Sequence, residues 1–208
     1  MLKPKPYIDV ETEPVQNLSD VDLSLTYSYA HYLNWLFEDR VELIKGKVFK
    51  MSPAPSRLHQ KISGQLFNST FNFLKNKGCE VYTAPFDVRF PRASKEDKDI
   101  FTVLQPDICV VCDHSKLDDR GCIGAPDLVI EILSPGNTKT ELFYKYEVYE
   151  EFGVKEYWVV SQSDQTILIY TLNQEGKFQP SKLFALGEKV SSSVLVGFEL
   201  ELNDVFAQ

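Results

Sequence analysis

The sequence predicts an α/β domain, with an α+β mixed sheet, in which helices pack on one main sheet. Three observations predict it: amphipathic helical patterns, short runs rich in β-branched and aromatic residues, and their order along the chain. That order is helix, hairpin, helix, several strands, helix and strands, which suits a mixed sheet covered by helices. The 208 residues are enough for one sizeable hydrophobic core.

The N-terminal part is expected to contain an arm and the start of the domain. Residues 1–22 are rich in Pro, Asp and Glu and show no period, so we expect a loose arm followed by a single domain over residues 23–208. Apolar residues at helical spacing predict a helix from about 26 to 37. Two short strands around Lys45-Gly46 predict a hairpin.

The longest helical pattern covers residues 56–78. Ser56 suits the N-cap, and Gly78 suits the position just past the C-terminus. Its apolar stripe is formed by Leu58, Ile62, Leu66 and Phe73. Strands are then expected within 79–91 and 100–113.

The rest of the chain is expected to hold a loop, a buried strand, a helix and further strands. Residues 114–126 have the composition of a connecting loop. A helix should follow the buried strand, starting at a capping box of Thr138 and Glu141 and ending at Gly153. The C-terminal strands are expected at 155–160, 165–172 and once or twice within 191–206.

Composition describes an ordinary folded protein, with 43% hydrophobic and 25% charged residues. No apolar run approaches the roughly 20 residues that span a bilayer, and the N-terminus lacks the apolar centre of a signal peptide, so a cytoplasmic protein without a membrane segment is expected. The net charge of −8 argues mildly against a general nucleic-acid binder. A nuclease can nevertheless be acidic overall if a basic strip lines its cleft.

The four cysteines do not predict a metal or redox site. Cys109 and Cys112 form a CxxC, but residues three apart on a strand point to opposite faces, and no second CxxC follows. A zinc-ribbon-like module is therefore a remote alternative. We expect Cys79, Cys109, Cys112 and Cys122 to be small, partly buried thiols in a reducing compartment.

The stretch GAPDLVIEILSP, residues 124–135, reads as a buried strand that contains two acids. Because strand side chains alternate, Asp127 and Glu131 share one face with Val129. An ionised carboxylate in such a run is costly unless it is paired or binds a metal. Asp127 also has a plain explanation as turn chemistry after a proline.

Asp107, in QPDICVV, is a second acid in an apolar strand pattern. If its strand neighbours that of Glu131, the two carboxylates can converge on one Mg²⁺, which suits oxygen ligands and retained water. Such a cation polarises a phosphodiester, and a nearby lysine can orient the attacking water. The alternative is that Asp107 belongs to a turn and Glu131 to a surface ion pair.

Three motifs together resemble one family. QPDICVV, GAPDLVIEILSP and KYEVYEEFGVKEYW resemble the Uma-type restriction endonucleases of the PD-(D/E)XK nuclease superfamily, and so does VELIKGKVFKMSPAPSRLHQ upstream. The resemblance covers about residues 24–205. It implies a restriction-endonuclease-like core and Mg²⁺-dependent cleavage of DNA, with Mn²⁺ as an alternative cofactor.

The resemblance also implies roles for individual residues. Asp107 matches the acid of the PD motif and Glu131 that of the (D/E)xK motif, and both would bind the metal. The motif lysine would fall at position 133, where this chain has Leu133. The resemblance implies a lysine from the following helix, with Lys145 as the candidate and Lys139 as the alternative.

Glu42 and His59 match further positions of the family. Glu42 would add a carboxylate at the rim of the metal site, unless it pairs on the surface with Arg40 or Lys47. His59 would hydrogen-bond a phosphate or a metal-bound water, unless it faces solvent. Asp87 is a weaker candidate, because a pair with Arg89 or Arg92 would explain it.

The leading hypothesis is therefore a metal-dependent DNA endonuclease in which Asp107, Glu131 and Lys145 are catalytic. The competing hypothesis is a catalytically idle relative that binds nucleic acid or a protein partner through the same fold. A homodimer is expected, because many nucleases of this fold pair to cut two strands. The strands at 155–160 and 165–172 would form the dimer surface or pack inside the monomer.

Overall fold

The computed structural model describes residues 14–51, 55–134 and 139–207. Its α/β class agrees with the sequence prediction, but the strands form two six-stranded sheets and a small two-stranded one instead of one main sheet. The helices are α1 (Tyr29–Tyr32), α2 (Arg57–Leu74), α3 (Lys139–Phe152) and α4 (Leu202–Phe206), with three short 3-10 turns at Leu18–Asp20, Asp97–Asp99 and His114–Lys116.

The first sheet has the order β2-β1-β5-β4-β8-β7 and the second the order β12-β11-β10-β9-β6-β3. The first is built from β1 (Val41–Ile44), β2 (Lys47–Lys50), β4 (Val88–Arg89), β5 (Val103–Leu104), β7 (Leu117–Asp118) and β8 (Gly121–Ile123). The second is built from β3 (Glu80–Thr83), β6 (Ile108–Val111), β9 (Leu128–Leu133), β10 (Glu156–Ser161), β11 (Thr166–Leu172) and β12 (Phe178–Pro180). The small sheet pairs β13 (Lys189–Ser191) with β14 (Glu199–Glu201).

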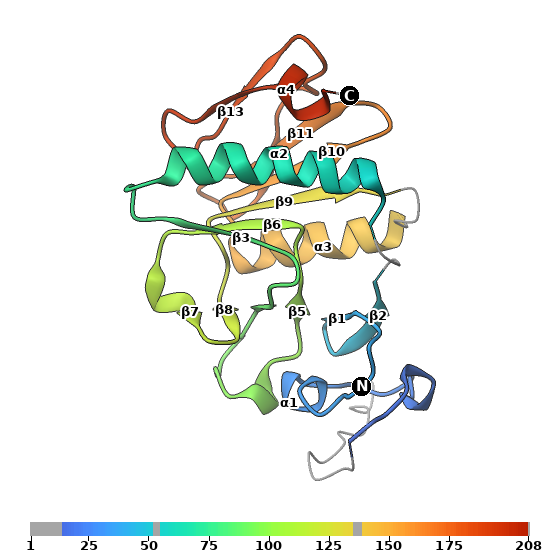
Figure 1. The fold of residues 1–208 in the computed structure, drawn as a ribbon. Helices are drawn as coiled ribbons and strands as arrows, with labels where there is room; N and C mark the ends of the chain where they lie inside the picture. Colours follow the sequence, from blue (N-terminus) through green and yellow to red (C-terminus); the bar gives the residue numbers. More distant parts are fainter. Residues whose placement is uncertain (1–13, 52–54, 135–138, 208) are drawn as a thin grey trace.

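Two helices cover opposite faces of the second sheet. Figure 1 shows α2 on one face, together with α4 and the small sheet, and α3 on the other face, toward the first sheet. The core follows this division: Leu128, Ile130 and Ile132 pack with α2, whereas Val129 packs with α3. The alternation predicted for this strand is therefore confirmed, and the odd-numbered face looks toward α3.

The predicted hairpin forms as expected. β1 and β2 pair antiparallel with Ile44 opposite Lys47, and both loop residues have positive φ, 51° at Lys45 and 76° at Gly46. Such a two-residue turn matches the twist of the flanking strands. A Cβ added at Gly46 would lie 2.3 Å from the Thr26 side chain and 3.2 Å from the Tyr27 backbone carbonyl, so a larger residue does not fit here.

Helix α2 begins as predicted, because the Ser56 side chain accepts a hydrogen bond from the His59 amide at 3.1 Å. It ends at Leu74, before Gly78, whose φ is +75°. Ile62 and Leu66 are buried as expected, but Leu58 is 41% exposed, so its place in the inner stripe was wrong. This first turn instead buries His59.

Gly64, in the middle of α2, is predicted to tolerate a side chain. No atom lies within 4 Å of an ideal Cβ at this position. Gly64→Ala should raise the free energy of unfolding by about 0.5–1 kcal/mol, because alanine loses less backbone entropy in a helix. Urea denaturation measures the change, and an unchanged or lower midpoint would contradict it.

Several local predictions differ from the structure. The helix expected over 26–37 is a single turn, α1, because its aromatic residues cluster with each other around Trp35. The loop expected over 114–126 contains the β7–β8 hairpin. Thr138 and the side chain of Glu141 lie outside the described residues, as do residues 1–13 of the predicted arm. Val15 and Val21, from the rest of that arm, pack with the cluster around Tyr29.

The prediction of four free thiols was wrong for two cysteines. Cys79 and Cys112 form a disulfide, while Cys109 and Cys122 are free and buried. Glu80 pairs with Val111 in the β3–β6 ladder, which brings the cysteines at the adjoining positions opposite each other. Sequence reasoning compared cysteines along one strand and missed this pairing across two strands. Within the described ranges, no helix has the length and apolarity that crossing a membrane requires.

Candidate active site

The candidate site lies where β6 and β9 run antiparallel in the second sheet. Ile108 is opposite Ile130, so the residue before β6, Asp107, comes opposite Glu131. The Asp107 Oδ2 accepts a hydrogen bond from the Ile132 amide at 2.8 Å, which fixes the loop to the neighbouring strand. The two acids predicted to converge are thus neighbours across one ladder.

Helix α3 supplies two donors to Glu131. Lys145 Nζ lies 3.0 Å from Glu131 Oε1, and the Tyr149 hydroxyl donates to the same oxygen at 2.6 Å. Lys145 and Tyr149 are four residues apart and therefore lie on the same face of the helix. Because both donate to Oε1, neither occupies the other carboxylate oxygen.

Glu42 reaches the same lysine from the first sheet. Its Oε1 is 3.1 Å from Lys145 Nζ and accepts the Gln105 backbone amide at 2.9 Å. Glu42 is only 2% exposed, so the alternative of a surface pair with Arg40 or Lys47 was wrong. The lysine ammonium therefore bridges carboxylates from the two sheets, and the third of its hydrogens remains for another acceptor.

Burial and neighbouring charges shift the pKa values of Glu131 and Lys145. Desolvation raises the pKa of Glu131 to about 7, against the lowering effect of Lys145, and Asp107 and Glu42 add to the rise. Burial also lowers the pKa of Lys145, but Glu131 and Glu42 reverse this and hold it well above its usual value. The amine is therefore a stable cation, while Glu131 titrates near neutral pH.

This titration predicts a pH-dependent effect of Glu131→Gln on stability. The pKa of Glu131 is raised in the folded chain, so the stability it contributes is fully present below its unfolded pKa of about 4.5 and is lost as the pH rises through about 7. Glutamine imitates the protonated acid. The free energy of unfolding of the variant, relative to wild type, should therefore rise by about 1–3 kcal/mol between pH 5 and 8. Chemical denaturation across this range measures it, and a pH-independent difference would contradict it.

His59 joins Asp107 from the opposite side of the sheet. Its Nε2 is 3.3 Å from Asp107 Oδ2, and its side chain is 8% exposed. The hydrogen bond to Asp107 raises the pKa of His59, although burial opposes the rise. The alternative that this histidine faces solvent was wrong. His59 from α2 and Lys145 from α3 thus contact the neighbouring acids Asp107 and Glu131.

Gln105 links the site to a second polar network that the sequence reasoning did not identify. Its Oε1 accepts from Arg40 Nη2 at 2.9 Å, and its Nε2 donates to Asp87 Oδ1 at 2.8 Å. Asp87 also accepts from the Tyr29 hydroxyl at 3.1 Å. The expected pairs of Asp87 with Arg89 or Arg92 were wrong, because those arginines pair with Asp118 and Glu151.

Tyr149 was also missed by the sequence reasoning, which gave this tyrosine no role in the site. Its four-residue spacing from Lys145 was the available signal. Asp127, the weaker acid of the same strand, pairs with Lys155 at 2.6 Å and accepts the Cys112 amide at 2.8 Å. It therefore stabilises the other end of β9. The side chain of Lys139, the alternative lysine, lies outside the described residues.

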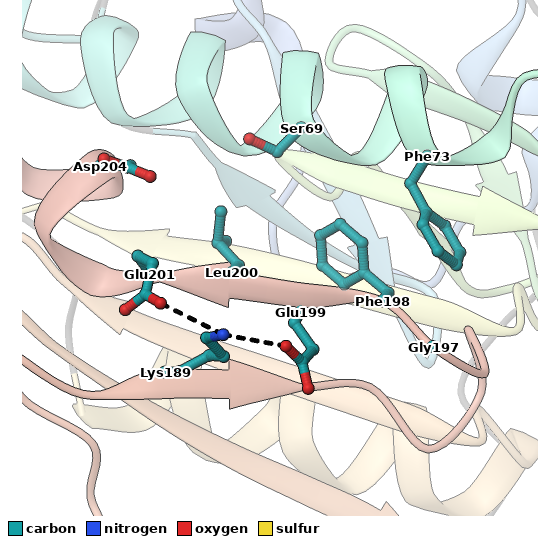
Figure 2. A pocket seen from close by; sticks show the side chains of 9 residues that line it. All are labelled: Ser69, Phe73, Lys189, Gly197, Phe198, Glu199, Leu200, Glu201 and Asp204. Carbon is teal, nitrogen blue, oxygen red and sulfur yellow. Dashed lines mark hydrogen bonds and ion pairs between the residues drawn. The ribbon is translucent and has the colours of Figure 1, made fainter.

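A pocket of about 210 Å³ opens beside Asp107 and His59. Arg40, Gln60, Ser63, Gly64 and Phe67 line it as well, so α2 forms one wall. A second hollow lies between α2 and the small sheet, around Phe73, Lys189, Glu199 and Glu201 (Figure 2). There Lys189 is already paired with both glutamates, at 2.9 and 3.3 Å, so this acidic hollow does not suit a polyanion.

The donor set agrees with a cation that keeps much of its water. Within the described residues, no three His, Cys, Asp or Glu side chains are arranged to hold a metal ion by themselves. Mg²⁺ usually binds through one or two carboxylates and completes its shell with water and substrate phosphates. Asp107 and Glu131 fit this requirement, because the contacts described above fall on one oxygen of each.

Comparisons with known proteins identify a family and a similar fold. A family model described as "Uma2: Putative restriction endonuclease" matches residues 29–203. The "Uncharacterized protein slr1290" of Synechocystis is 26% identical over 148 residues, which cover 70% of this chain and 74% of that protein. The crystal structure of a "putative nuclease belonging to DUF820" from Anabaena variabilis superimposes with a TM-score of 0.66 at 22% identity. That match covers 86% of this chain and 97% of the other, and it supports the fold.

Proposed function

From the premise that this chain belongs to the Uma2 family, we propose that it is a metal-dependent endonuclease that hydrolyses DNA phosphodiester bonds. The observation that carries the proposal is the convergence of Asp107, Glu131 and Lys145 from two strands and a helix. A lysine pointing to solvent would have favoured the idle relative. Lys145 is instead 4% exposed and held between two carboxylates.

Asp107 and Glu131 are the residues that would hold Mg²⁺, or Mn²⁺, which when bound supplies Lewis-acid polarisation of the phosphodiester. The other side chains position the attacking water and the two carboxylates, and stabilise the charge that develops on the phosphate. Lys145 presents its remaining N–H to the attacking water or to the charge that develops on the phosphate oxygens. Tyr149 holds the Glu131 carboxylate in place, and His59 does the same for Asp107.

The charge distribution along the chain supports a polyanionic substrate. No Asp or Glu occurs between residues 43 and 79, although the protein as a whole is acidic. The same stretch contains the basic residues Lys45, Lys47, Lys50, Arg57, Lys61, Lys75 and Lys77. It includes all of α2, the helix that carries His59 and borders the pocket. The helix that borders the pocket thus carries no acidic residue that would repel a polyanion.

Plasmid nicking tests the proposal. Purified protein should convert supercoiled plasmid to open-circular and linear forms with Mg²⁺ or Mn²⁺, and not with EDTA. Absence of cleavage with either metal, in a protein that is folded by circular dichroism, would favour the idle relative.

Homodimerisation is part of the proposal but no longer has support from β10 and β11. These strands lie inside the second sheet, with β10 between β9 and β11. Their buried side chains include Tyr157, Trp158 and Ile169, which pack within the chain.

A further inference from the structure

We propose that the pocket beside Asp107 receives one unpaired nucleotide of the DNA strand, adjacent to the bond that is cut. This inference rests on the proposed function and specifies its substrate class. It predicts a preference for single-stranded or locally unpaired DNA over a regular duplex. Four features of the described residues carry it.

The first feature is the position and size of the pocket. Asp107 and His59 belong both to the pocket wall and to the candidate active site, so an occupant lies next to the catalytic groups. A volume of about 210 Å³ is on the scale of one nucleobase and too small for a base pair. A base that enters such a pocket has to leave its stack and its partner strand.

The second feature is an arginine that is held in place and carries an unneutralised charge. Arg40 donates through Nε and Nη2 to Gln105 Oε1, at 3.3 and 2.9 Å. Gln105 is itself fixed by Asp87 and by its backbone bond to Glu42. Among the residues that the structure describes, no carboxylate lies within ion-pair distance of Arg40, so its guanidinium is available to a phosphate.

The third feature is an aromatic surface. Phe67 lines the pocket and stacks on Phe71, with ring centroids 5.7 Å apart and an angle of 20° between the rings. Bases stack on aromatic side chains without regard to sequence. Gln60 and Ser63, on the same side of α2, add polar groups that suit base edges or phosphate.

The fourth feature is unfilled space and an unsatisfied polar atom. Gly64 lines the pocket, and an added Cβ there would meet no atom within 4 Å. His59 Nδ1 is buried without a hydrogen-bond partner. Gly64 is exposed and leaves room for an occupant, and the buried Nδ1 of His59 is a polar atom that an occupant can satisfy.

Binding measurements in EDTA test the proposal without cleavage. The probes are a fluorescein-labelled single-stranded oligonucleotide of about 12 nucleotides, the same strand annealed to its complement, and the same strand with abasic sites. Fluorescence anisotropy gives the Kd for each. We expect wild type to bind the single strand about tenfold more tightly than the duplex and the abasic strand, because neither of these offers an unpaired base that can stack on Phe67.

Variants then locate the binding to this pocket. Phe67→Ala removes the stacking surface and Gly64→Leu fills the space, and each should weaken single-strand binding about tenfold. Phe143→Ala is the matched control: it removes an exposed aromatic ring, 57% exposed, on α3 and outside the pocket, and should leave the Kd within about twofold. Gly64→Ala checks that a change at this glycine leaves the chain folded.

The outcomes separate this inference from the proposed function. Equal affinity of wild type for single strand, duplex and abasic strand would overturn it, and so would unchanged binding in both pocket variants. Plasmid nicking together with either result would leave the nuclease proposal standing without this subsite. Pocket-dependent binding without any nicking would support the subsite in a catalytically idle protein.

Discussion

Glu131→Gln and Asp107→Asn should each reduce Mg²⁺-dependent plasmid nicking by at least about a thousandfold. Both changes keep the size of the side chain but remove the negative charge that, on the proposed function, would hold a divalent cation. Such a cation supplies several kcal/mol of transition-state stabilisation. Initial rates of loss of supercoiled plasmid, measured across Mg²⁺ concentrations, give the effect. Restoration of full activity by high Mg²⁺ would show that the charge is dispensable.

The matched control for Glu131→Gln is Asp127→Asn. Asp127 is buried on the same face of the same strand segment, but it pairs with Lys155 and the Cys112 amide, away from Lys145. Its removal should affect stability and leave the nicking rate per folded molecule within a few-fold of wild type. If Asp127→Asn abolishes cleavage as completely as Glu131→Gln, the assignment of Glu131 as a metal ligand is wrong.

Lys145→Met should destabilise the fold by about 3–5 kcal/mol at pH 8, besides abolishing cleavage. Methionine has a similar length, but it leaves the buried Glu42 and Glu131 carboxylates without their cation, and an uncompensated buried charge is costly. The loss should be smaller at pH 5, because the pKa of Glu131 is already raised and protonation removes one of the two charges. Urea denaturation at both pH values measures the change.

A second substitution separates the effect of the unpaired charge on stability from the effect of lost packing. Lys145→Met combined with Glu131→Gln should be more stable at pH 8 than Lys145→Met alone, because one unpaired carboxylate is gone. Lys189→Met provides an exposed comparison and should remain near wild type, because surface ion pairs contribute little. A double variant no more stable than the single one would assign the loss to packing.

Much of the candidate site could be predicted because its members occur in local patterns. Glu131 is conspicuous as an acid in a buried strand, and Asp107 directly precedes β6, the strand that pairs with it. Resemblance to a known family added Glu42, His59 and Lys145, and the structure brings all five residues to one region. Their catalytic roles remain predictions that the substitutions above test.

The missed features depend on pairings between distant segments. The bond of Gln105 to Glu42 joins β1 to the end of β5, and the disulfide of Cys79 with Cys112 joins β3 to β6. The local pattern of apolar residues does not show which strands become neighbours. One main sheet was therefore predicted, whereas the strands form two six-stranded sheets. Short strands such as β7 and β8 were missed because a few residues carry too little pattern.

The bridge from Lys145 to acids of two different sheets has a consequence for the timing of activity during synthesis. A nascent chain that has released only its first hundred residues lacks Asp107, Glu131 and the helix that joins them to Glu42. If the chain cleaves DNA as proposed, amino-terminal fragments that end before Lys145 lack this bridge and should therefore be inactive.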